Sequence, residues 1–205
     1  MKESFSEIKN AVSQETVIER SKFICRIEKV ATEEAARAVI DEVRKAHPFA
    51  THNCYAYVVN NGETARFSDD GEPQGTAGQP MLEVLKNKGL FNVVAVVTRY
   101  FGGIKLGAGG LVRAYSGAVS SAAAQAGTVV LKLSDVYEFS FAYDKLKAFE
   151  KCCASNAITV LSTDYSENIT AKTAIVKPSE NGVARIVDAL SGKVNATFAG
   201  EGYYE

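Results

Sequence analysis

Residues 92–126 read NVVAVVTRYFGGIKLGAGGLVRAYSGAVSSAAAQA, an apolar run, a glycine-rich loop and an alanine-rich stretch in succession. The run at 92–101 is apolar at consecutive positions, which is typical of a central strand whose two faces are both covered. The stretch at 111–126 is rich in the best helix-forming residue and stops before Gly127, which predicts a helix. The sequence therefore predicts a strand, a sharp turn and a helix inside an α+β fold.

Strand and helix signals on both sides of this segment predict two domains. Before it, the pattern predicts antiparallel strands, a helix and a hairpin, at 15–30, 34–46, 53–60 and 64–68. After it, two strands are expected at 128–133 and 136–142, and the second begins a strand, helix, strand, strand, helix, strand series. That series is the order of a ferredoxin-like βαββαβ unit. We therefore expect an N-terminal α/β sandwich domain at 1–133 and a ferredoxin-like domain at 134–205.

Charge is distributed unevenly along the 205 residues, although the formal net charge is only −1. Residues 1–133 carry 16 basic and 14 acidic side chains, whereas residues 134–205 carry 7 and 10. No acid lies between Glu83 and Asp135, and this window contains Lys86, Lys88, Arg99, Lys105, Arg113 and Lys132. The glycine loop lies inside the window, so its surroundings are expected to attract anions.

The composition is that of an ordinary globular protein, with 46% hydrophobic and 23% charged residues. No run approaches the ~20 apolar residues that a membrane-spanning helix needs, and the first residues lack an apolar signal-peptide core. The four cysteines show no CxxC spacing, which favours a reducing compartment and disfavours zinc. We expect a cytoplasmic protein with no metal, no cofactor and no membrane partner.

The loop between the central strand and the helix is a candidate anion site. A helix N-terminus presents free N–H groups and a partial positive charge, and glycines let a phosphate approach the backbone closely. Arg99 at the strand end, Lys105 in the loop and Arg113 in the first turn would contact the anion. Close approach would be allowed by Gly102, Gly103, Gly107, Gly109 and Gly110. A tight turn with close packing is the alternative explanation of these glycines.

The loop is not a standard nucleotide-binding motif. It contains neither G-x-x-x-x-G-K-[ST] nor G-x-G-x-x-G, because the position three after Gly109 is not glycine. Tyr100, Phe101 and Tyr115 flank the cations. Aromatic rings beside arginine and lysine suit single-stranded nucleic acid, in which bases stack and phosphates pair, although the rings would also suit packing beneath the loop.

A second polar loop, SDDGEPQGTAGQP at 68–80, offers three carboxylates. Asp69, Asp70 and Glu72 would bind Mg²⁺ or act as acid and base, or else they would form Asx-type turns. The Asp-Gly and Glu-Pro pairs favour the turn interpretation. The deciding question is whether this loop meets Arg99 and Lys105, because ion pairs would then replace metal ligation.

His52 is a candidate for the edge of the same groove, together with Asp69, Asp70, Glu72, Thr76 and Tyr100. Cys54 lies two residues after His52, and on a strand the two side chains share a face. A catalytic cysteine needs a base and an oxyanion hole, but the apolar alternation after Cys54 favours a packed thiol. The sequence assigns no catalytic residue.

Three segments resemble the signature blocks of the Impact family, whose bacterial members are called YigZ-like. They are HPFATHNCYAY at 47–57, DDGEPQGTAGQPML at 69–82 and VVTRYFGGIKLGAGGLVRAY at 96–115. The resemblance implies an N-terminal domain like the second domain of a small-subunit ribosomal protein and domain IV of elongation factor G. It also implies a C-terminal domain like domain V of elongation factor G, and a link to the regulation of translation.

Three functional hypotheses are open, and the first is favoured. The protein binds nucleic acid, with RNA or the ribosome as its partner, and regulates translation. Alternatively, it is an enzyme that acts on a small phosphorylated or acidic substrate, or an adaptor whose acidic C-terminal half binds a protein. A long open groove would favour nucleic acid, whereas a closed pocket with a perturbed carboxylate would favour an enzyme.

Overall fold

The strand predicted at 92–101 is β6 (Val93–Tyr100), and every residue of it except Tyr100 is buried. It is the middle strand of an antiparallel sheet in the order β2-β3-β6-β4-β5. The other strands of this sheet are β2 (Val12–Ile18), β3 (Ser21–Lys29), β4 (His52–Val59) and β5 (Thr64–Ser68). The prediction of a central strand covered on both faces is therefore confirmed.

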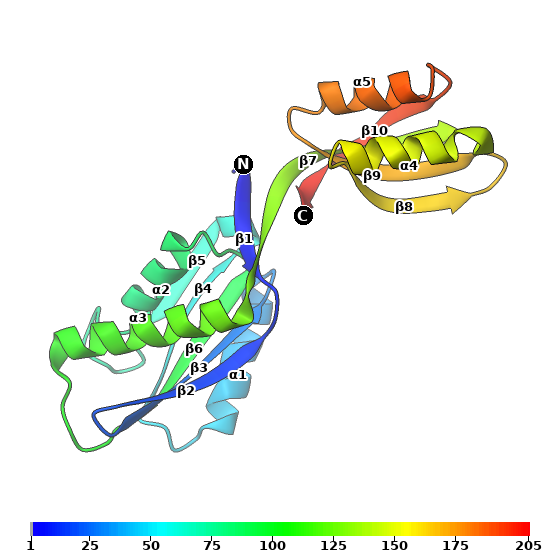
Figure 1. Cartoon of the computed structure of the whole chain (residues 1–205). Helices are drawn as coiled ribbons and strands as arrows, with labels where there is room; N and C mark the ends of the chain where they lie inside the picture. The colour runs from blue at the N-terminus through cyan, green and yellow to red at the C-terminus, as the bar shows by residue number, and fades with distance from the viewer. Residues whose placement is uncertain (1) are drawn as a thin grey trace. The chain divides into compact units, whose positions relative to one another are not determined.

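The computed structural model describes residues 2–205, which divide into two compact units. The sheet around β6 belongs to the unit Phe5–Val130, and the other unit joins the described residues up to Ser4 with Leu131–Glu205. In each unit helices pack on a largely antiparallel sheet (Figure 1), which makes the fold α+β as expected. The assignment of 1–133 and 134–205 as the two domains stays a prediction.

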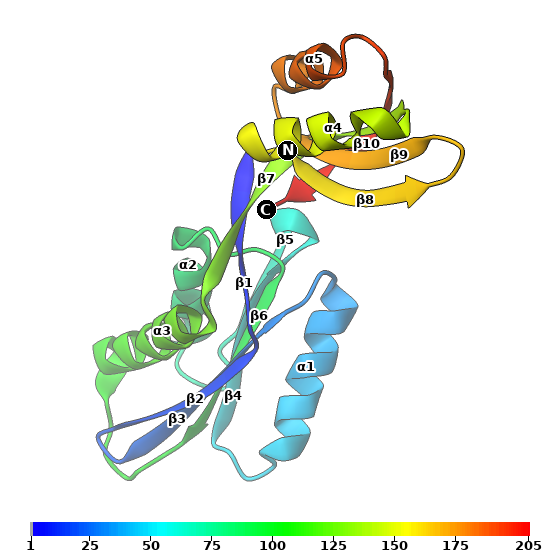
Figure 2. The ribbon, with the colours of Figure 1, turned by 45° about the vertical axis from the view of Figure 1, so that its right-hand side comes forward.

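Helix α1 (Glu33–Ala46) covers one face of the first sheet, and α2 (Gly78–Asn87) and α3 (Gly107–Ala126) cover the other (Figure 2). Thr32 is the N-cap of α1, and its hydroxyl accepts a hydrogen bond from Ala35 N at 3.2 Å. Acidic residues in the first turn of α1 and basic residues in its last turn complement the helix dipole. The helix thus forms where its local signals place it.

Small side chains bring α3 close to the sheet. Its buried face includes alanines that recur every four residues, at Ala114, Ala118, Ala122 and Ala126. Among them Tyr115 is fully buried, and its ring meets the ring of Phe23 from β3 edge-on with centroids 5.3 Å apart. This packing fixes the first turn of α3 beside the end of β6.

The second sheet contains β7, which pairs with β9 and β10, and β8, which pairs with β9. The elements follow the order β7 (Thr128–Phe141), α4 (Leu146–Ser155), β8 (Thr159–Tyr165), β9 (Ile169–Val176), α5 (Glu180–Ala189) and β10 (Asn195–Tyr204). Helices α4 and α5 lie on one face of this sheet (Figure 1), over a core that includes Phe139, Phe141 and Phe149.

Two features of the second sheet differ from the sequence-based expectation. Strand β7 runs without a break through Ser134, whereas two strands were expected at 128–133 and 136–142. Ser134 is buried and is paired on both sides, with Val176 of β9 and Gly202 of β10, so a polar residue here does not end the strand. Strand β1 (Ser4–Ile8), which pairs with β7, was not predicted at all.

Candidate functional site

The glycine loop leaves the end of β6 and enters the first turn of α3, and two of its glycines have a packing role. A Cβ on Gly102 would overlap the backbone carbonyl group of Arg20, so only glycine fits there. The Gly102 N–H also donates to Ser21 Oγ at 3.2 Å. A Cβ on Gly110 would lie 3.0 Å from Leu106 Cβ, which is a tight contact. Packing alone therefore explains why glycine occupies these two positions.

The other three glycines border open space. Within the described chain, a Cβ on Gly103 or Gly107 would meet no atom within 4 Å, and one on Gly109 would meet only Arg113 Nη1 at 3.9 Å. Gly107 begins α3 with a φ of +69°, which other residues adopt only at a cost. In residues 2–205 no side chain caps this helix N-terminus, and no acid occupies its first turn. Its N–H groups are thus left for water or an anion.

Lys105 and Arg113 are the exposed cations beside the start of α3. Lys105 lines two pockets, one of about 380 Å³ shared with Arg113 and Gly110, and one of about 370 Å³ shared with Arg99 and Phe101. Neither Lys105 nor Arg113 has an ion-pair partner in the part of the chain that the structure describes. Both charges are therefore available to an incoming anion.

Arg99 lies deeper and already has a partner. Its side chain is buried, with 5% of the residue exposed, and its Nη1 is 2.6 Å from Glu72 Oε1. Nη2 donates to Ser21 Oγ at 3.3 Å, and the guanidinium lies between the rings of Phe23 and Phe101 at 5.4 and 5.5 Å from their centroids. Its Nε is buried without a hydrogen-bond partner in residues 2–205. The side chain expected to contact a phosphate thus holds a carboxylate instead.

Glu72 is the centre of a buried polar cluster. It is 7% exposed and accepts a second hydrogen bond from the hydroxyl of Tyr115 at 2.8 Å. Burial raises the pKa of Tyr115 above its ordinary value, so its hydroxyl stays a donor. His52 Nε2 lies 3.8 Å from Glu72 Oε2. The ion pair with Arg99 therefore joins the acidic loop to the end of β6, and Glu72 lines one pocket with Lys105 and Gly107 of the glycine loop.

Asp69 holds the acidic loop in shape through three backbone donors. Its Oδ1 accepts from Ala77 N at 3.0 Å and from Gly78 N at 2.8 Å, and its Oδ2 accepts from Gly75 N at 2.8 Å. Gly78 is the first residue of α2, so the carboxylate also satisfies the N-terminus of that helix. Asp69 thus stabilises the loop as the turn interpretation expected, but its partners lie six to nine residues ahead, so the contact is not an Asx turn.

Asp70 and Thr76 make contacts of the same kind. Asp70 Oδ2 accepts from Asn53 N at 2.6 Å, and its Oδ1 accepts from Arg44 at 3.2 Å. The hydroxyl of Thr76 donates to the carbonyl of Pro73 at 2.6 Å. These contacts fix the conformation of the acidic loop, and they occupy side-chain oxygen atoms that a ligand would otherwise bind.

His52 and Tyr100 lie on different sides of the sheet. His52 Nδ1 is 2.8 Å from the carbonyl oxygen of Asp70, so His52 joins the cluster around Glu72. Tyr100 directly follows Arg99 on β6, and neighbouring side chains of a strand point to opposite faces. Its hydroxyl lies 2.9 Å from Nδ1 of His47, the residue that follows α1. The structure therefore brings His52, but not Tyr100, to the buried carboxylate.

Cys54 is a packed thiol and not a nucleophile. It is fully buried, and its Sγ donates to the carbonyl of Asp69 at 2.9 Å. Burial raises the pKa of Cys54 to about 12, and burial does the same for Cys25 on β3. Since the thiolate is the reactive form, both thiols are inert near neutral pH.

We expect the free energy of unfolding to fall above pH 9 because of these two thiols. In the unfolded chain they ionise near 9.0, whereas in the folded chain they stay protonated up to about 12. The stabilisation is thus complete below pH 9, and each thiol accounts for a loss of about 1.4 kcal/mol between pH 8 and pH 10. Urea denaturation at both pH values measures the loss. Cys25→Ala/Cys54→Ala should remove this part of the pH dependence, and its full survival in the variant would contradict the assignment.

One exposed aromatic residue at this end of the unit was not predicted from the sequence. Phe49, in the loop after α1, is 91% exposed, and Phe101 is 48% exposed. The loop of Phe49 is tied to the end of β6, because Phe101 N donates to Thr51 Oγ1 at 3.0 Å. The only sequence signal was an apolar side chain outside any periodic segment. Phe101 thus stands near the start of α3, and Phe49 lies in a loop that is joined to the same end of β6.

The described residues contain no ready metal centre. In residues 2–205 no group of three or more His, Cys, Asp or Glu side chains is placed to hold a metal ion. The carboxylates of the acidic loop are engaged by protein donors, as the contacts of Asp69, Asp70 and Glu72 show.

In residues 2–205 no helix is long and apolar enough to span a membrane.

Several known proteins are similar to this chain. Residues 19–123 match the family described as the Impact N-terminal domain. The IMPACT family member YvyE of Bacillus subtilis is 42% identical over 202 residues, which cover 98% of this chain and 93% of that protein. The IMPACT family member YigZ of Escherichia coli is 38% identical across 77% of this chain and 79% of that protein. A solved structure described as that of a hypothetical protein is 34% identical, with a TM-score of 0.63 and coverage of 96% and 97%.

Proposed function

Because this chain belongs to the Impact family, we propose that it binds RNA, free or in the ribosome, and acts in the regulation of translation in the cytoplasm. The observation that carries the proposal is the start of α3, a helix N-terminus that no described side chain caps and that lies beside exposed Lys105 and Arg113. A phosphate near Gly107 would meet backbone N–H groups and both cations. The absence of any acid between Glu83 and Asp135 in the sequence adds to this attraction.

Exposed aromatic rings favour nucleic acid over a small anion. Phe49 and Phe101 present large apolar surfaces to solvent, and Ile104 is also exposed. Unpaired bases stack on such rings while arginine and lysine pair with the phosphates, which is the usual way in which single strands are bound. The exposed cations and rings together suit a single-stranded segment of RNA.

Arg99 supports this site indirectly. By pairing with Glu72, it holds the acidic loop against the end of β6, where the glycine loop begins, and its guanidinium packs on the ring of Phe101. Contacts within the acidic loop and between this loop and β4 shape the same wall, and they involve His52, Asp69, Asp70 and Thr76. In this proposal Lys105 and Arg113 contact phosphate, and Arg99 positions the surface that they stand on.

The fold supports a partner in the translation machinery. We propose that the unit Phe5–Val130 is similar to the second domain of a small-subunit ribosomal protein and to domain IV of elongation factor G. We also propose that the unit containing Leu131–Glu205 is ferredoxin-like, similar to domain V of that factor. Its β-α-β-β-α-β order and the antiparallel neighbours β10-β7-β9-β8 support this view.

The variant Lys105→Gln/Arg113→Gln is expected to bind RNA more weakly and with less dependence on salt. Each lost contact with a single strand changes the slope of log affinity against log salt by about 0.7, so two contacts change it by about 1.4. Fluorescence anisotropy with a short labelled single-stranded RNA at several NaCl concentrations measures this slope. The control Lys86→Gln/Lys88→Gln removes the same charge near the end of α2 and should keep the slope. No binding by the natural protein at the lowest salt, to RNA or to ribosomes, would refute the proposal.

A second candidate function is an enzyme that acts on a small phosphorylated or acidic substrate. The pocket of about 370 Å³ favours it, because buried Glu72 and Arg99 line this pocket together with Lys105. Buried, paired charges at the wall of a pocket are typical of sites for charged ligands. A screen of phosphorylated metabolites for turnover, run on the natural protein and on Glu72→Gln, tests this function. Equal turnover by both proteins would exclude Glu72 from the chemistry.

A further inference from the structure

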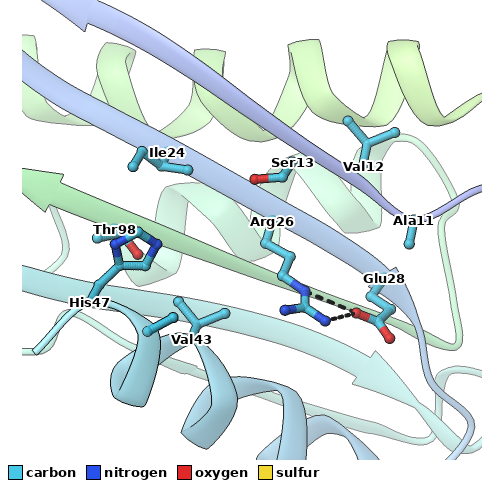
Figure 3. A pocket seen from close by; sticks show the side chains of 10 residues that line it. Ala11, Val12, Ser13, Ile24, Arg26, Glu28, Val43, His47 and Thr98 are labelled. Carbon is cyan, nitrogen blue, oxygen red and sulfur yellow. Dashed lines mark hydrogen bonds and ion pairs between the residues drawn. The ribbon is translucent and has the colours of Figure 1, made fainter.

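Helix α1 packs on β4 and β6 and leaves a pocket on each side of it. The pocket toward β2 and β3 has a volume of about 380 Å³ and is lined by Ser13, Ile24 and Arg26 among others (Figure 3). Arg26 pairs with Glu28 of its own strand and with Glu42 of α1, each at 2.8 Å. Its charge is compensated on both sides, so this first pocket does not favour an anion.

The pocket on the other side of α1 is different, because three arginines line it. Arg37 and Arg44 come from α1 and Arg66 from β5, around a volume of about 370 Å³. Arg37 pairs with Glu33 one turn earlier, and Arg44 pairs with Asp70 at 3.2 Å. In the part of the chain described, no carboxylate lies within ion-pair distance of Arg66. Exposed ion pairs contribute little to stability, so a phosphate can replace either carboxylate.

Two tyrosine rings of β4 line this second pocket. The rings of Tyr55 and Tyr57 stack with centroids 6.0 Å apart and an angle of 9° between their planes. Tyr57 is 3% exposed, whereas Tyr55 is partly exposed. The guanidinium of Arg44 lies 5.8 Å from the centre of the Tyr55 ring. Phe67 of β5 also borders the pocket, but it is paired with Ala56, so its side chain leaves the sheet on the opposite face from Tyr55 and Arg66.

Arg66 and the partly exposed Tyr55 favour an anion that also carries flat rings. Glu33 and Asp70 pair with the other two arginines and Asp41 also lines the pocket, so the attraction depends on a phosphate replacing these exposed carboxylates. An acidic peptide would pair with the arginines, but it would leave the stacked tyrosines without a ring partner. Unpaired nucleotides supply both a phosphate for each guanidinium and a base for the rings, and bases in a duplex are not free to stack in this way.

We propose that the surface formed by Arg37, Arg44, Arg66, Tyr55 and Tyr57, the arginine–tyrosine groove, binds single-stranded RNA. A base stacks on Tyr55, and phosphates pair with the arginines. The proposal rests on RNA as the partner proposed above and adds a second contact surface. This surface lies on the α1 face of the sheet, whereas α3 covers the opposite face (Figure 2).

The test compares variants of the full chain for binding of a labelled oligouridylate by anisotropy. Arg37→Gln/Arg66→Gln is expected to lower the slope of log affinity against log salt by about 1.4, because two phosphate contacts are lost. Tyr55→Leu keeps an apolar side chain but cannot stack, so its Kd should rise roughly 5- to 150-fold. Phe67→Leu changes an exposed ring on the opposite face of the sheet and should leave Kd unchanged, which makes it the matched control. Duplex RNA should compete poorly with the single strand.

Controls separate this proposal from the proposed function. If Lys105→Gln/Arg113→Gln loses binding while the groove variants bind like the natural protein, the proposal that the groove binds RNA is wrong. The start of α3 is then the RNA site. If Lys86→Gln/Lys88→Gln lowers the slope as much as Arg37→Gln/Arg66→Gln, net charge alone explains the effect and the groove is again overturned. If polyglutamate displaces the RNA and Tyr55→Leu binds normally, the partner is an acidic peptide. If the natural protein binds no RNA at low salt, both proposals fall together.

Discussion

Arg99→Leu is expected to lower the free energy of unfolding by about 4 kcal/mol, because it leaves the buried carboxylate of Glu72 without its cation. The carboxylate is 3% exposed in its side chain and would keep only the hydroxyl of Tyr115 as a close donor. A loss of this size corresponds to a fall in Tm of roughly 10–15 °C. Urea denaturation followed by circular dichroism measures it, and Glu72→Leu should cost a similar amount because it leaves a buried guanidinium.

The double variant Glu72→Leu/Arg99→Leu separates the ion pair from the packing. It should recover much of the loss, because neither charge is then buried alone and leucine suits the apolar surroundings of Phe23 and Leu111. The exposed pair of Glu15 and Lys22, 3.1 Å apart, provides the control, and Lys22→Gln should cost less than about 0.5 kcal/mol. A loss below about 1 kcal/mol for Arg99→Leu would show that the ion pair between Glu72 and Arg99 does not hold the acidic loop against the end of β6.

Local patterns predicted those parts of the fold in which local and tertiary preferences agree. The apolar run of β6 required cover on both faces, and the pattern at 34–46 predicted a helix, so both elements lie as expected. The break expected in β7 at Ser134 is absent, because pairing on both sides of that residue outweighs its weak strand preference. Strand β1 has only five residues and depends on its partner strand, which no local pattern reveals.

The candidate site was predictable only where its signals are local. Lys105 and Arg113 stand close to the glycine turn in sequence, and the structure places both beside the start of α3. The pairing of Arg99 with Glu72 joins residues 27 positions apart, and nothing in either segment specifies it. The arginine–tyrosine groove likewise combines α1 with β4 and β5, so its charge and its rings meet only after the sheet has formed.

Asp69→Asn is expected to lower the free energy of unfolding by about 3 kcal/mol. Asparagine has one acceptor oxygen, so if it keeps the bonds from Ala77 N and Gly78 N, its amide group faces the N–H of Gly75, donor against donor. The two retained bonds also lose their charge assistance, and an unsatisfied buried donor costs about 1–3 kcal/mol. Thermal and urea denaturation of the variant measure the loss, which should be accompanied by weaker protection of the first amides of α2 from hydrogen exchange.

The neighbouring Asp70→Asn is the matched control, since it makes the same change of charge one residue away. Its amide oxygen can still accept from Asn53 N, and its other contact is the half-exposed Arg44, so it should cost only about 1 kcal/mol. Mg²⁺ at millimolar concentration should stabilise neither the natural protein nor the variants, because both oxygens of Asp69 are already occupied by backbone donors. Stabilisation of the natural protein by Mg²⁺ that disappears in Asp69→Asn would make this carboxylate a metal ligand, whereas equal losses for the two variants would mean that the three backbone bonds do not hold the acidic loop.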